Sequence, residues 1–316
     1  MSKYTFGVDV GGTSVKLGLF EENGKLIKKW SIATDKSCGG KNIIPHIAYE
    51  IEKMLSELGI EKSAVEGAGI CVPGPVDKSG LVRGCVNLGW GNKRAADELE
   101  DITAIRCRAL NDADAAGLGE AVYGHGGKYG SVVMVTIGTV VGGAVIHNGH
   151  VLAGSRGNAG EIGHFKVNID ETEKCSCGKC GCLEQYASAT GILKFVKDNI
   201  YRFENSTLNS FDGFTVKDIA ACAKNGDMLS LMAFDRAGKY IALGLSYMAG
   251  AVDPDAFILG GGVSRAGNVI FEPVKKYFGL FSFNTECEAQ IIPALLGNDA
   301  GIYGASEFVK NRGGLA

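Results

Sequence analysis

The strongest constraint on the fold is a short plan that occurs twice along the chain: an apolar strand, a glycine-containing turn and a second apolar strand. The first copy covers residues 4–20 around Gly11-Gly12-Thr13, and the second covers residues 131–146 around Gly138-Thr139. Apolar, β-branched runs on both sides of a tight glycine turn predict a β-hairpin. The sequence therefore predicts an internal duplication, with one hairpin opening each half of the chain.

Helix and strand signals alternate outside these hairpins. Apolar residues at helical spacing predict a helix over residues 42–58, and a buried strand at 65–72 ends at Pro73-Gly74-Pro75. Another helix is expected to begin at Asn111-Asp112-Ala113-Asp114 and to run to about Val122, with Asp112 or Asp114 suited to its first turn. Further helices are expected at about 187–200, 215–224, 228–251 and 268–277 and at the end of the chain, with strands at 256–259 and 289–293. A chain of 316 residues with this alternation is expected to form two α/β domains.

Composition and charge argue against several classes of protein. The net charge is −3 and the lysines and arginines are dispersed, so the basic stripe of a nucleic-acid-binding protein is missing. No apolar run reaches the roughly 18 residues needed to span a bilayer, and no charged-then-apolar leader opens the chain. We therefore expect a cytoplasmic protein with small-molecule partners, no nucleic acid and no membrane. The scattered cysteines are expected to be mostly small core residues: Cys38, Cys71, Cys85, Cys107, Cys222 and Cys287.

Four cysteines lie within eight residues, at positions 175, 177, 180 and 182, and His164 precedes the first of them by eleven positions. Thiolates and imidazole are the usual ligands of tetrahedral zinc, which takes four, so this loop predicts a zinc site with one thiol to spare. The Cys177-x-x-Cys180 pair would also suit a redox dithiol. Thioredoxin-like pairs follow a strand at a helix start, however, whereas this cluster lies in a glycine-rich loop. Metal binding is the favoured interpretation.

The repeated glycine turns suggest phosphate binding. Gly11-Gly12-Thr13 can present backbone N–H groups and a hydroxyl to a phosphate, and Asp9 is placed to hold a hydrated Mg²⁺. One such hairpin is more often a plain turn, but the motif recurs at Gly138-Thr139 and a third loop, Gly260-Gly261-Gly262, follows a buried strand. Neither a P-loop nor a strand-linked G-x-G-x-x-G is present, which argues against P-loop NTPases and dinucleotide dehydrogenases. The pattern favours a nucleoside triphosphate held by hairpins.

Taken in order, these motifs resemble those of the ROK (repressor, open reading frame, kinase) family of sugar kinases. The resemblance runs from residue 4 to about 308 and is carried by Asp9-Val-Gly-Gly-Thr-Ser-Val-Lys16, Pro73-Gly74-Pro75-Val76, Asn111-Asp112 through Glu120, Ala159-Gly-Glu161-Ile-Gly-His164, the cysteine loop through Glu184, and Leu259-Gly-Gly-Gly262. Among the members, the chain looks most like bacterial ATP-dependent glucokinases. The resemblance implies a two-domain actin-like (ribonuclease-H-like) ATPase fold with an inter-domain cleft and a zinc-binding loop. The implied small domain is 1–112 plus 301–316, and the large domain is 113–300 with the zinc loop at 164–184.

The resemblance also implies roles for individual residues. Asp112 would be the general base that takes the proton from the 6-hydroxyl of glucose as this oxygen attacks the γ-phosphoryl group of ATP. From the residues alone, a helix-capping role for Asp112 stays open, although Asp114 is the better candidate for a pure cap. Sugar contacts would be Gly74, Asn111, Asp112, Glu161, His164 and Glu184. ATP contacts, with Mg²⁺, would be Asp9, Gly11, Gly12, Thr13, Lys16, Gly138, Thr139, Gly260, Gly261 and Gly262. Structural Zn²⁺ would be bound by His164, Cys175, Cys177 and Cys182, which leaves Cys180 spare.

One motif departs from the family pattern. The second phosphate loop of the family usually reads Gly-Thr-Gly-x-Gly-Gly-Gly, whereas this chain has Val140 and Ala144 at two of the glycine positions. A β-branched residue where positive φ or close phosphate approach is expected would weaken ATP binding or slow turnover. The resulting hypothesis is that Val140→Gly raises kcat/KM for ATP.

Other functions within the family stay open. The substrate could be fructose, mannose, allose, N-acetylmannosamine or N-acetylglucosamine, and the departure at Val140 would also suit a catalytically weak sugar-binding sensor. The family's repressors carry an N-terminal helix-turn-helix, for which we expect no room before the first phosphate hairpin. A homodimer or homotetramer is expected, as in the family.

Overall fold

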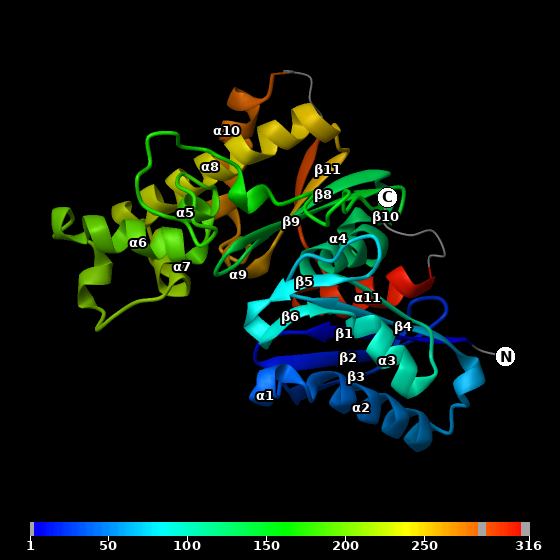
Figure 1. Ribbon diagram of the computed structural model, residues 1–316. Helices are drawn as coiled ribbons and strands as arrows, with labels where there is room; N and C mark the ends of the chain where they lie inside the picture. Colours follow the sequence, from blue (N-terminus) through cyan, green and yellow to red (C-terminus); the bar gives the residue numbers. More distant parts are fainter. Residues whose placement is uncertain (1–2, 284–288, 311–316) are drawn as a thin grey trace. The chain divides into compact units, whose positions relative to one another are not determined.

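The chain divides into two compact units. The structure, a computed structural model, describes residues 3–283 and 289–310 (Figure 1). The first unit comprises the residues up to 130, residues 144–160 and those from 295 onward, and the second comprises residues 131–143 and 161–294. The family resemblance implied one large domain of residues 113–300. In the structure, residues 113–130, 144–160 and 295–300 belong to the first unit instead. The physical reason is that α4 (Asp112–Tyr123) packs tightly on α11 (Ala300–Lys310): a Cβ on Gly119 would lie 2.4 Å from the Ala300 carbonyl oxygen.

The first unit is built on a five-stranded sheet in the order β3-β2-β1-β4-β7. Its strands are β1 (Tyr4–Val10), β2 (Ser14–Glu21), β3 (Leu26–Ala33), β4 (Val65–Val72) and β7 (Cys107–Asn111). The β1–β2 hairpin is antiparallel as predicted, and β4 and β7 run parallel to β1. Helix α11 lies directly on the sheet. It approaches β4 so closely that a Cβ on Gly69 would lie 1.7 Å from the Ala305 carbonyl oxygen. Gly7 of β1 makes the same kind of contact with Ile302. Glycines on two neighbouring strands therefore permit the close packing of α11 on the sheet.

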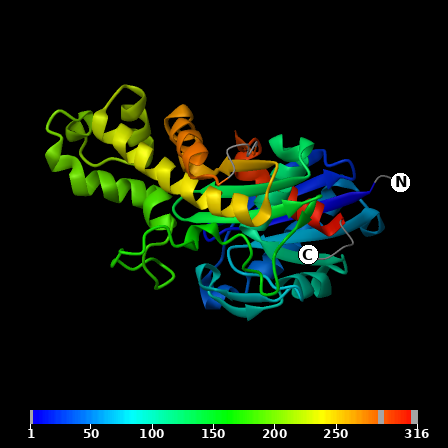
Figure 2. The same ribbon diagram turned by 90° about the horizontal axis from the view of Figure 1, so that it is seen from above.

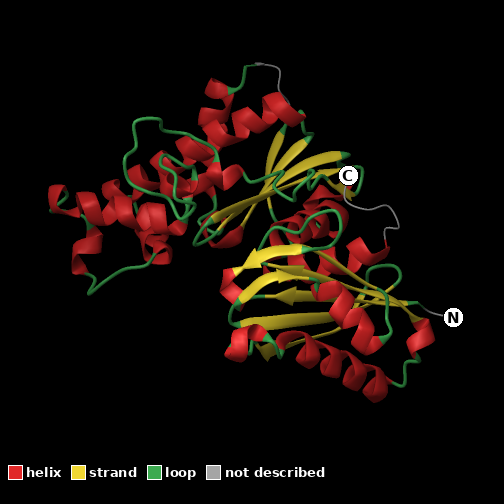
Figure 3. Ribbon diagram, viewed as in Figure 1, coloured by secondary structure: helices red, strands yellow, loops and turns green. Residues whose placement is uncertain are grey.

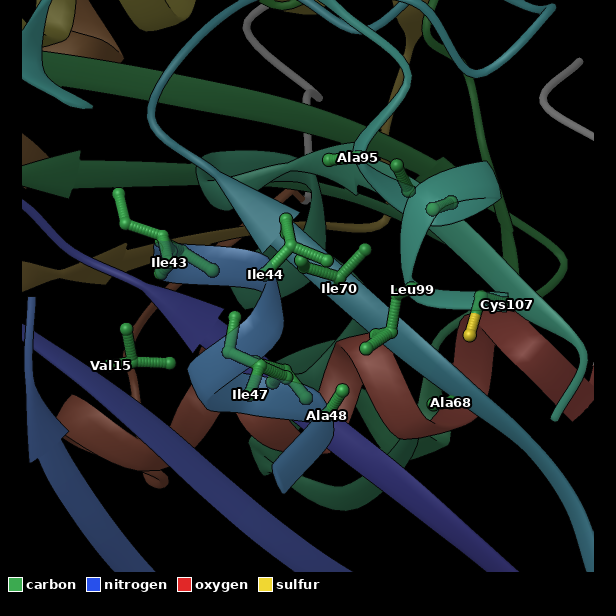
Figure 4. Packing of buried hydrophobic residues seen from close by; sticks show 14 of the residues in the cluster. Val15, Ile43, Ile44, Ile47, Ala48, Ala68, Ile70, Ala95, Leu99 and Cys107 are labelled. Carbon is green, nitrogen blue, oxygen red and sulfur yellow. The ribbon is translucent and has the colours of Figure 1, made fainter. Parts of the chain in front are cut away.

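The core of the first unit lies between the sheet and two helices, α2 (Ile43–Leu58) and α3 (Ala95–Thr103). Figure 4 shows Ile44 and Ile47 of α2 close to Ile70 of β4, with Leu99 of α3 beside them. All four side chains are fully buried. The apolar spacing that predicted α2 therefore reflects this one buried face.

A second five-stranded sheet repeats the same plan, in the order β10-β9-β8-β11-β12. Its strands are β8 (Ser131–Ile137), β9 (Val141–His147), β10 (His150–Val151), β11 (Ala256–Gly260) and β12 (Gln290–Pro293). In both sheets the first two strands of the copy are neighbours, the third strand extends one side, and two parallel strands extend the other. The predicted duplication is confirmed by this shared topology.

The second unit also contains several helices (Figure 3). They are α5 (Glu184–Ala187), α6 (Ala189–Asn199), α7 (Val216–Lys224), α8 (Met228–Val252), α9 (Gly261–Ser264) and α10 (Asn268–Phe281). The long helix α8 lies beside α10 in both views (Figures 1 and 2), and a Cβ on Gly238 would lie 2.5 Å from Cβ of Pro273. Within the described part of the chain, no helix is long and apolar enough to cross a membrane.

Several short elements complete the structure. They are α1 (Ser37–Gly40), β5 (Val82–Cys85), β6 (Trp90–Lys93) and the 3-10 helices η1 (Lys62–Ala64), η2 (Val86–Leu88), η3 (His125–Lys128), η4 (Ile162–His164), η5 (Ile200–Arg202), η6 (Thr207–Ser210) and η7 (Gly297–Asp299). The predicted core cysteines at 71, 85, 107 and 222 are buried. Cys38 is exposed, because it lies in a surface turn with positive φ, and Cys287 is outside the described residues.

Candidate active site

The first phosphate hairpin is a tight turn between β1 and β2. Gly11 N donates to Ser14 O at 3.0 Å, and the Thr34 hydroxyl donates to Gly11 O at 2.7 Å. Neither Gly11 nor Gly12 has positive φ. Instead, a Cβ on Gly11 would lie 2.9 Å from Ser14 O, whereas the nearest atom to a Cβ on Gly12 would be Asn87 O at 3.7 Å. Glycine is thus needed at position 11 for the turn itself, and Gly12 leaves backbone open to a ligand.

Two charged residues face each other at the base of this turn. Asp9 and Lys16 are direct partners across the hairpin, and Lys16 Nζ lies 3.2 Å from Asp9 Oδ2. Lys16 Nζ also donates to Asn298 O at 2.9 Å, and Cys71 Sγ lies 3.7 Å from Asp9 Oδ1. The side chain of Asp9 is 19% exposed. A carboxylate and an ammonium group therefore stand beside the glycine turn, as a magnesium–phosphate ligand would require.

Gly74, Asn111 and Asp112 meet where two parallel strands end. Strands β4 and β7 are neighbours with Val72 opposite Asn111, so the residues that follow each strand lie at the same sheet edge. Asn111 Nδ2 donates to Gly74 O at 3.1 Å. Its Oδ1 accepts from the backbone N–H groups of Ala113 and Asp114 at 2.8 and 3.2 Å, which caps α4. Asn111 is therefore the cap that sequence reasoning assigned to Asp114.

Asp112 is the first residue of α4, and its side chain is exposed. The helix N-terminus favours the ionised form of a carboxylate in the first turn. Asp114 is in the same turn but is buried. Asp112 Oδ1 accepts from the Ala113 backbone N–H at 2.9 Å, a donor that it shares with Asn111, and the residue lies exposed at the sheet edge that carries Gly74.

In the second unit, α6 holds the second phosphate loop. Ala189 N donates to Gly138 O at 2.8 Å, and the Thr190 hydroxyl donates to Thr139 O at 3.0 Å. Gly138 N donates to Val140 O at 2.9 Å, which closes the turn. The side chain of Val140 is 56% exposed and its φ is not positive. The expected strain at this position is therefore absent, because the turn does not use a left-handed residue there.

A cavity of about 880 Å³ opens beside this loop. It is lined by Gly138, Thr139, Ala189, Thr190, Leu193, Phe214, Thr215, Val216, Lys217, Ala220, Ala221, Lys224, Phe234, Gly262, Val263, Arg265 and Ala266. Its walls combine apolar side chains with three cations and with backbone of two of the predicted phosphate loops. Gly261 has a φ of +85° where the chain turns from β11 into α9. A Cβ at this position would lie 2.4 Å from the Ile137 carbonyl oxygen, so the turn requires glycine. Sequence reasoning found the glycines of this cavity and missed its apolar and cationic walls.

The predicted metal ligands lie together. The donor atoms of His164, Cys175, Cys177 and Cys182 are all within 4.8 Å of one another. Cys177 Sγ lies 3.6 Å from Cys182 Sγ, and Cys175 Sγ lies 3.9 Å from His164 Nδ1. Ligands of a tetrahedral zinc with bonds of about 2.3 Å are roughly 3.7 Å apart, so these distances fit such a site. Cys180 is outside the group and its Sγ contacts Thr172 O at 3.4 Å.

Two acidic residues of the same unit adjoin the ligand group. Glu184 begins α5 and is buried, and its Oε1 accepts hydrogen bonds from Ser176 Oγ at 2.5 Å and from Cys175 Sγ at 2.9 Å. Glu161 immediately precedes η4. Within η4, Gly163 lies so close to Val141 that an added Cβ would be 2.0 Å from the Val141 carbonyl oxygen. The acidic turn therefore packs directly on the second phosphate loop.

A second cavity, of about 390 Å³, also borders this loop. Its lining includes Thr139 and Val140 together with Cys175, Ser176 and Glu184. Thr139 lines both of these cavities, whereas Val140 lines only the smaller one. Within their units, the predicted sugar residues form two groups: Gly74, Asn111 and Asp112 in the first, and Glu161, His164 and Glu184 in the second.

Comparison with known proteins gives a consistent result along the whole chain. The family model described as the ROK family matches residues 5–312. A glucokinase of Halalkalibacterium halodurans is 35% identical, over 98% of this chain and 96% of its own, and a glucokinase of Thermotoga maritima is 34% identical, over 97% of each. A crystal structure of a ROK family glucokinase from Streptomyces griseus in complex with glucose and AMPPNP superposes with a TM-score of 0.78 at 32% identity. It covers 96% of this chain and 98% of its own.

Proposed function

This chain belongs to the ROK family, and we propose that it is a glucokinase, which transfers the γ-phosphoryl group of ATP to the 6-hydroxyl of glucose. One observation carries the proposal: Asn111 caps α4 and donates to Gly74 O, and the neighbouring Asp112 carboxylate is exposed at the same sheet edge. The glucokinases of H. halodurans and T. maritima support glucose as the substrate among the hexoses that the family's kinases use.

Asp112 is the proposed general base. A carboxylate within hydrogen-bond reach of the sugar hydroxyl can accept its proton as the oxygen attacks phosphorus, and positioning matters more than basicity in this step. Asn111 and Gly74 would bind other hydroxyls of the same sugar, while the cap holds Asn111 in one rotamer. From the second unit, Glu161, His164 and Glu184 are the proposed sugar ligands, because carboxylates and imidazole accept strong hydrogen bonds from hydroxyls.

ATP is the proposed phosphoryl donor, and the 880 Å³ cavity is its proposed adenosine site. The volume lies in the range of nucleotide-sized pockets, and apolar walls such as Leu193 and Phe214 suit a base. The backbone of Gly138, Thr139 and the Gly260–Gly262 loop would approach the phosphates. In the first unit, Gly11, Gly12, Thr13 and Lys16 would contact phosphate oxygens, and Asp9 would hold the hydrated Mg²⁺ that accompanies ATP.

Zn²⁺ is the proposed structural metal of the second unit. Three thiols and one imidazole at tetrahedral spacing are a donor set that suits zinc, and we assign His164, Cys175, Cys177 and Cys182 as its ligands. The ion would supply a rigid cross-link and no chemistry at phosphorus. Because Nδ1 of His164 is the ring nitrogen near Cys175, Nε2 is free to bind the sugar in a fixed orientation. Glu184 also accepts from the hydroxyl of Ser176, the neighbour of Cys175, and this bond would orient its carboxylate once zinc has ionised the thiol.

A sugar panel tests the proposal. Purified protein with MgATP is assayed for ADP release and sugar-6-phosphate with glucose, fructose, mannose, allose, N-acetylmannosamine and N-acetylglucosamine. We expect the highest kcat/KM with glucose. A higher value for another sugar would replace glucose as the substrate while keeping the kinase. Sugar binding by calorimetry without turnover on any of them would instead favour a sugar-binding sensor.

A further inference from the structure

One hydroxyl group holds residues 168–173, the segment before the four cysteines, which we call the arm. Tyr186, on α5, donates from its hydroxyl to Glu171 Oε2 at 2.6 Å and accepts from Asn168 Nδ2 at 2.9 Å. The other oxygen of Glu171 accepts from the backbone N–H groups of Thr172 and Glu173, each at 2.9 Å. Burial raises the pKa of Tyr186 to about 12, so the hydroxyl remains a donor at neutral pH. Residues 168–173 are thus tied to α5 through one side chain.

The ring of Tyr186 is itself clamped by α8. Its centroid lies 4.2 Å from that of Tyr240, and the guanidinium carbon of Arg236 lies 4.7 Å from it. The same guanidinium lies 5.0 Å from the Phe195 ring and 5.3 Å from the Tyr240 ring. A partly desolvated arginine among three aromatic rings gains cation–π attraction from each of them. Arg236 therefore fixes the position of the Tyr186 ring.

The clamped arm is the surface on which the cysteine turn packs. Val167 N and Asn168 N both donate to Gly181 O, at 2.9 and 3.3 Å, and a Cβ on Gly181 would lie 1.8 Å from Asn168 O. Gln185, next to Tyr186, donates to Glu173 O at 2.9 Å and accepts from Cys182 N at 3.0 Å. Both ends of the turn that carries the three cysteine ligands are therefore attached to elements that Tyr186 holds.

We propose that Tyr186 and Arg236 are positioning residues of the metal site: through Glu171 and Asn168 they hold the arm that keeps the ligand atoms at zinc spacing. This inference rests on the zinc site assigned under the proposed function. It goes beyond that assignment because neither residue belongs to the group of four ligands. Outer-shell groups of this kind typically change metal affinity by about 10- to 100-fold.

The test is the rate at which zinc-loaded protein releases zinc to a chromogenic chelator. Tyr186→Phe removes the hydroxyl and keeps the ring, and Tyr240→Phe is the matched control, because it alters the other ring of the same stack. We expect release about tenfold faster than wild type in Tyr186→Phe, an unchanged rate in Tyr240→Phe and an intermediate rate in Arg236→Lys. Thermal melting of the zinc-loaded proteins shows whether each variant is folded.

The outcomes separate the two proposals. Equal release rates for wild type, Tyr186→Phe and Arg236→Lys, all zinc-bound and folded, overturn the positioning role and leave the zinc site standing. If wild-type protein retains no zinc after dialysis that removes the unbound ion, both the zinc site and the positioning role are overturned. If Tyr186→Phe does not fold, the Arg236→Lys rate decides alone, and a wild-type rate there overturns the proposal.

Discussion

Gly301 packs against the carboxylate of Asp9: a Cβ at position 301 would lie 3.1 Å from both Cγ and Oδ2 of that side chain. Asp9 in turn faces Lys16 across the first phosphate hairpin. The closing helix α11 therefore packs on the acid proposed to hold Mg²⁺, and a Cβ at position 301 would displace the carboxylate by a few tenths of an ångström.

Gly301→Ala is expected to lower kcat with MgATP by about tenfold, because a displacement of the Asp9 carboxylate misplaces the metal–phosphate complex. Gly279→Ala is the control, since a Cβ there meets no atom within 4 Å and α10 should gain about 0.5–1 kcal/mol. Steady-state kinetics in ATP and thermal melts of both variants make the comparison. A Gly301→Ala enzyme with wild-type kcat would show that Asp9 is not positioned by this contact.

Thr190→Val is expected to raise KM for ATP about threefold to tenfold. The substitution keeps the shape of the side chain but removes the hydrogen bond to Thr139 O, which is worth about 1 kcal/mol. Thr190→Ser keeps the hydroxyl and should stay close to wild type. Equal KM values for ATP in the valine and serine variants would contradict an anchoring role for this hydroxyl.

Val140→Gly is expected to leave kcat/KM for ATP within about twofold of wild type. The sequence suggested an increase, because a β-branched residue replaces a family glycine. Val140 is exposed, its φ is not positive, and it lines the smaller cavity, whereas Gly138 and Thr139 line the cavity proposed for adenosine. Initial-rate kinetics in ATP decide, and a rise of tenfold would restore the original hypothesis.

Asp77 should make the first unit sensitive to acid. Its Oδ1 accepts hydrogen bonds from Ser79 and Leu81, and Oδ2 from Arg83, and the Ser79 hydroxyl is the main cause that lowers the pKa of Asp77 to about 2. Because the folded pKa is below the ordinary value of 3.8, the stabilisation is complete above about pH 4 and is lost as the pH falls towards 2.

Urea unfolding of wild type at pH 6, 4, 3 and 2 measures this loss. Asp77→Asn should be less stable than wild type at pH 6, and the difference in unfolding free energy should shrink below about pH 4. Asp101→Asn, at an exposed position of α3, is the control. A difference between wild type and Asp77→Asn that stays constant from pH 6 to 2 would contradict the assignment.

Local patterns predicted the parts of the fold that local forces determine. The apolar spacing of α2, the repeated hairpins and the helix that begins beside Asn111 are all found. The grouping of the four predicted metal ligands could be expected from the sequence, because three of them lie within eight residues.

Features that depend on distant contacts were missed. The bond from Asn111 to Gly74 joins residues that follow two different strands, and the cavity walls at Phe214 and Arg265 are brought together only by the packing of α6, α7 and α9. The unit boundaries differ from the predicted domains because α4 packs on α11, which is far from it in the sequence.

The central claim is that the Asp112 carboxylate takes the proton from glucose, and Asp112→Asn tests it most directly. The measurement is kcat for glucose phosphorylation, with glucose affinity determined separately by calorimetry. Because the amide keeps hydrogen bonding but cannot accept the proton, we predict a kcat at least about 100-fold lower with glucose affinity within about threefold of wild type. A variant that binds glucose normally and turns over at a rate within threefold of wild type would contradict the account.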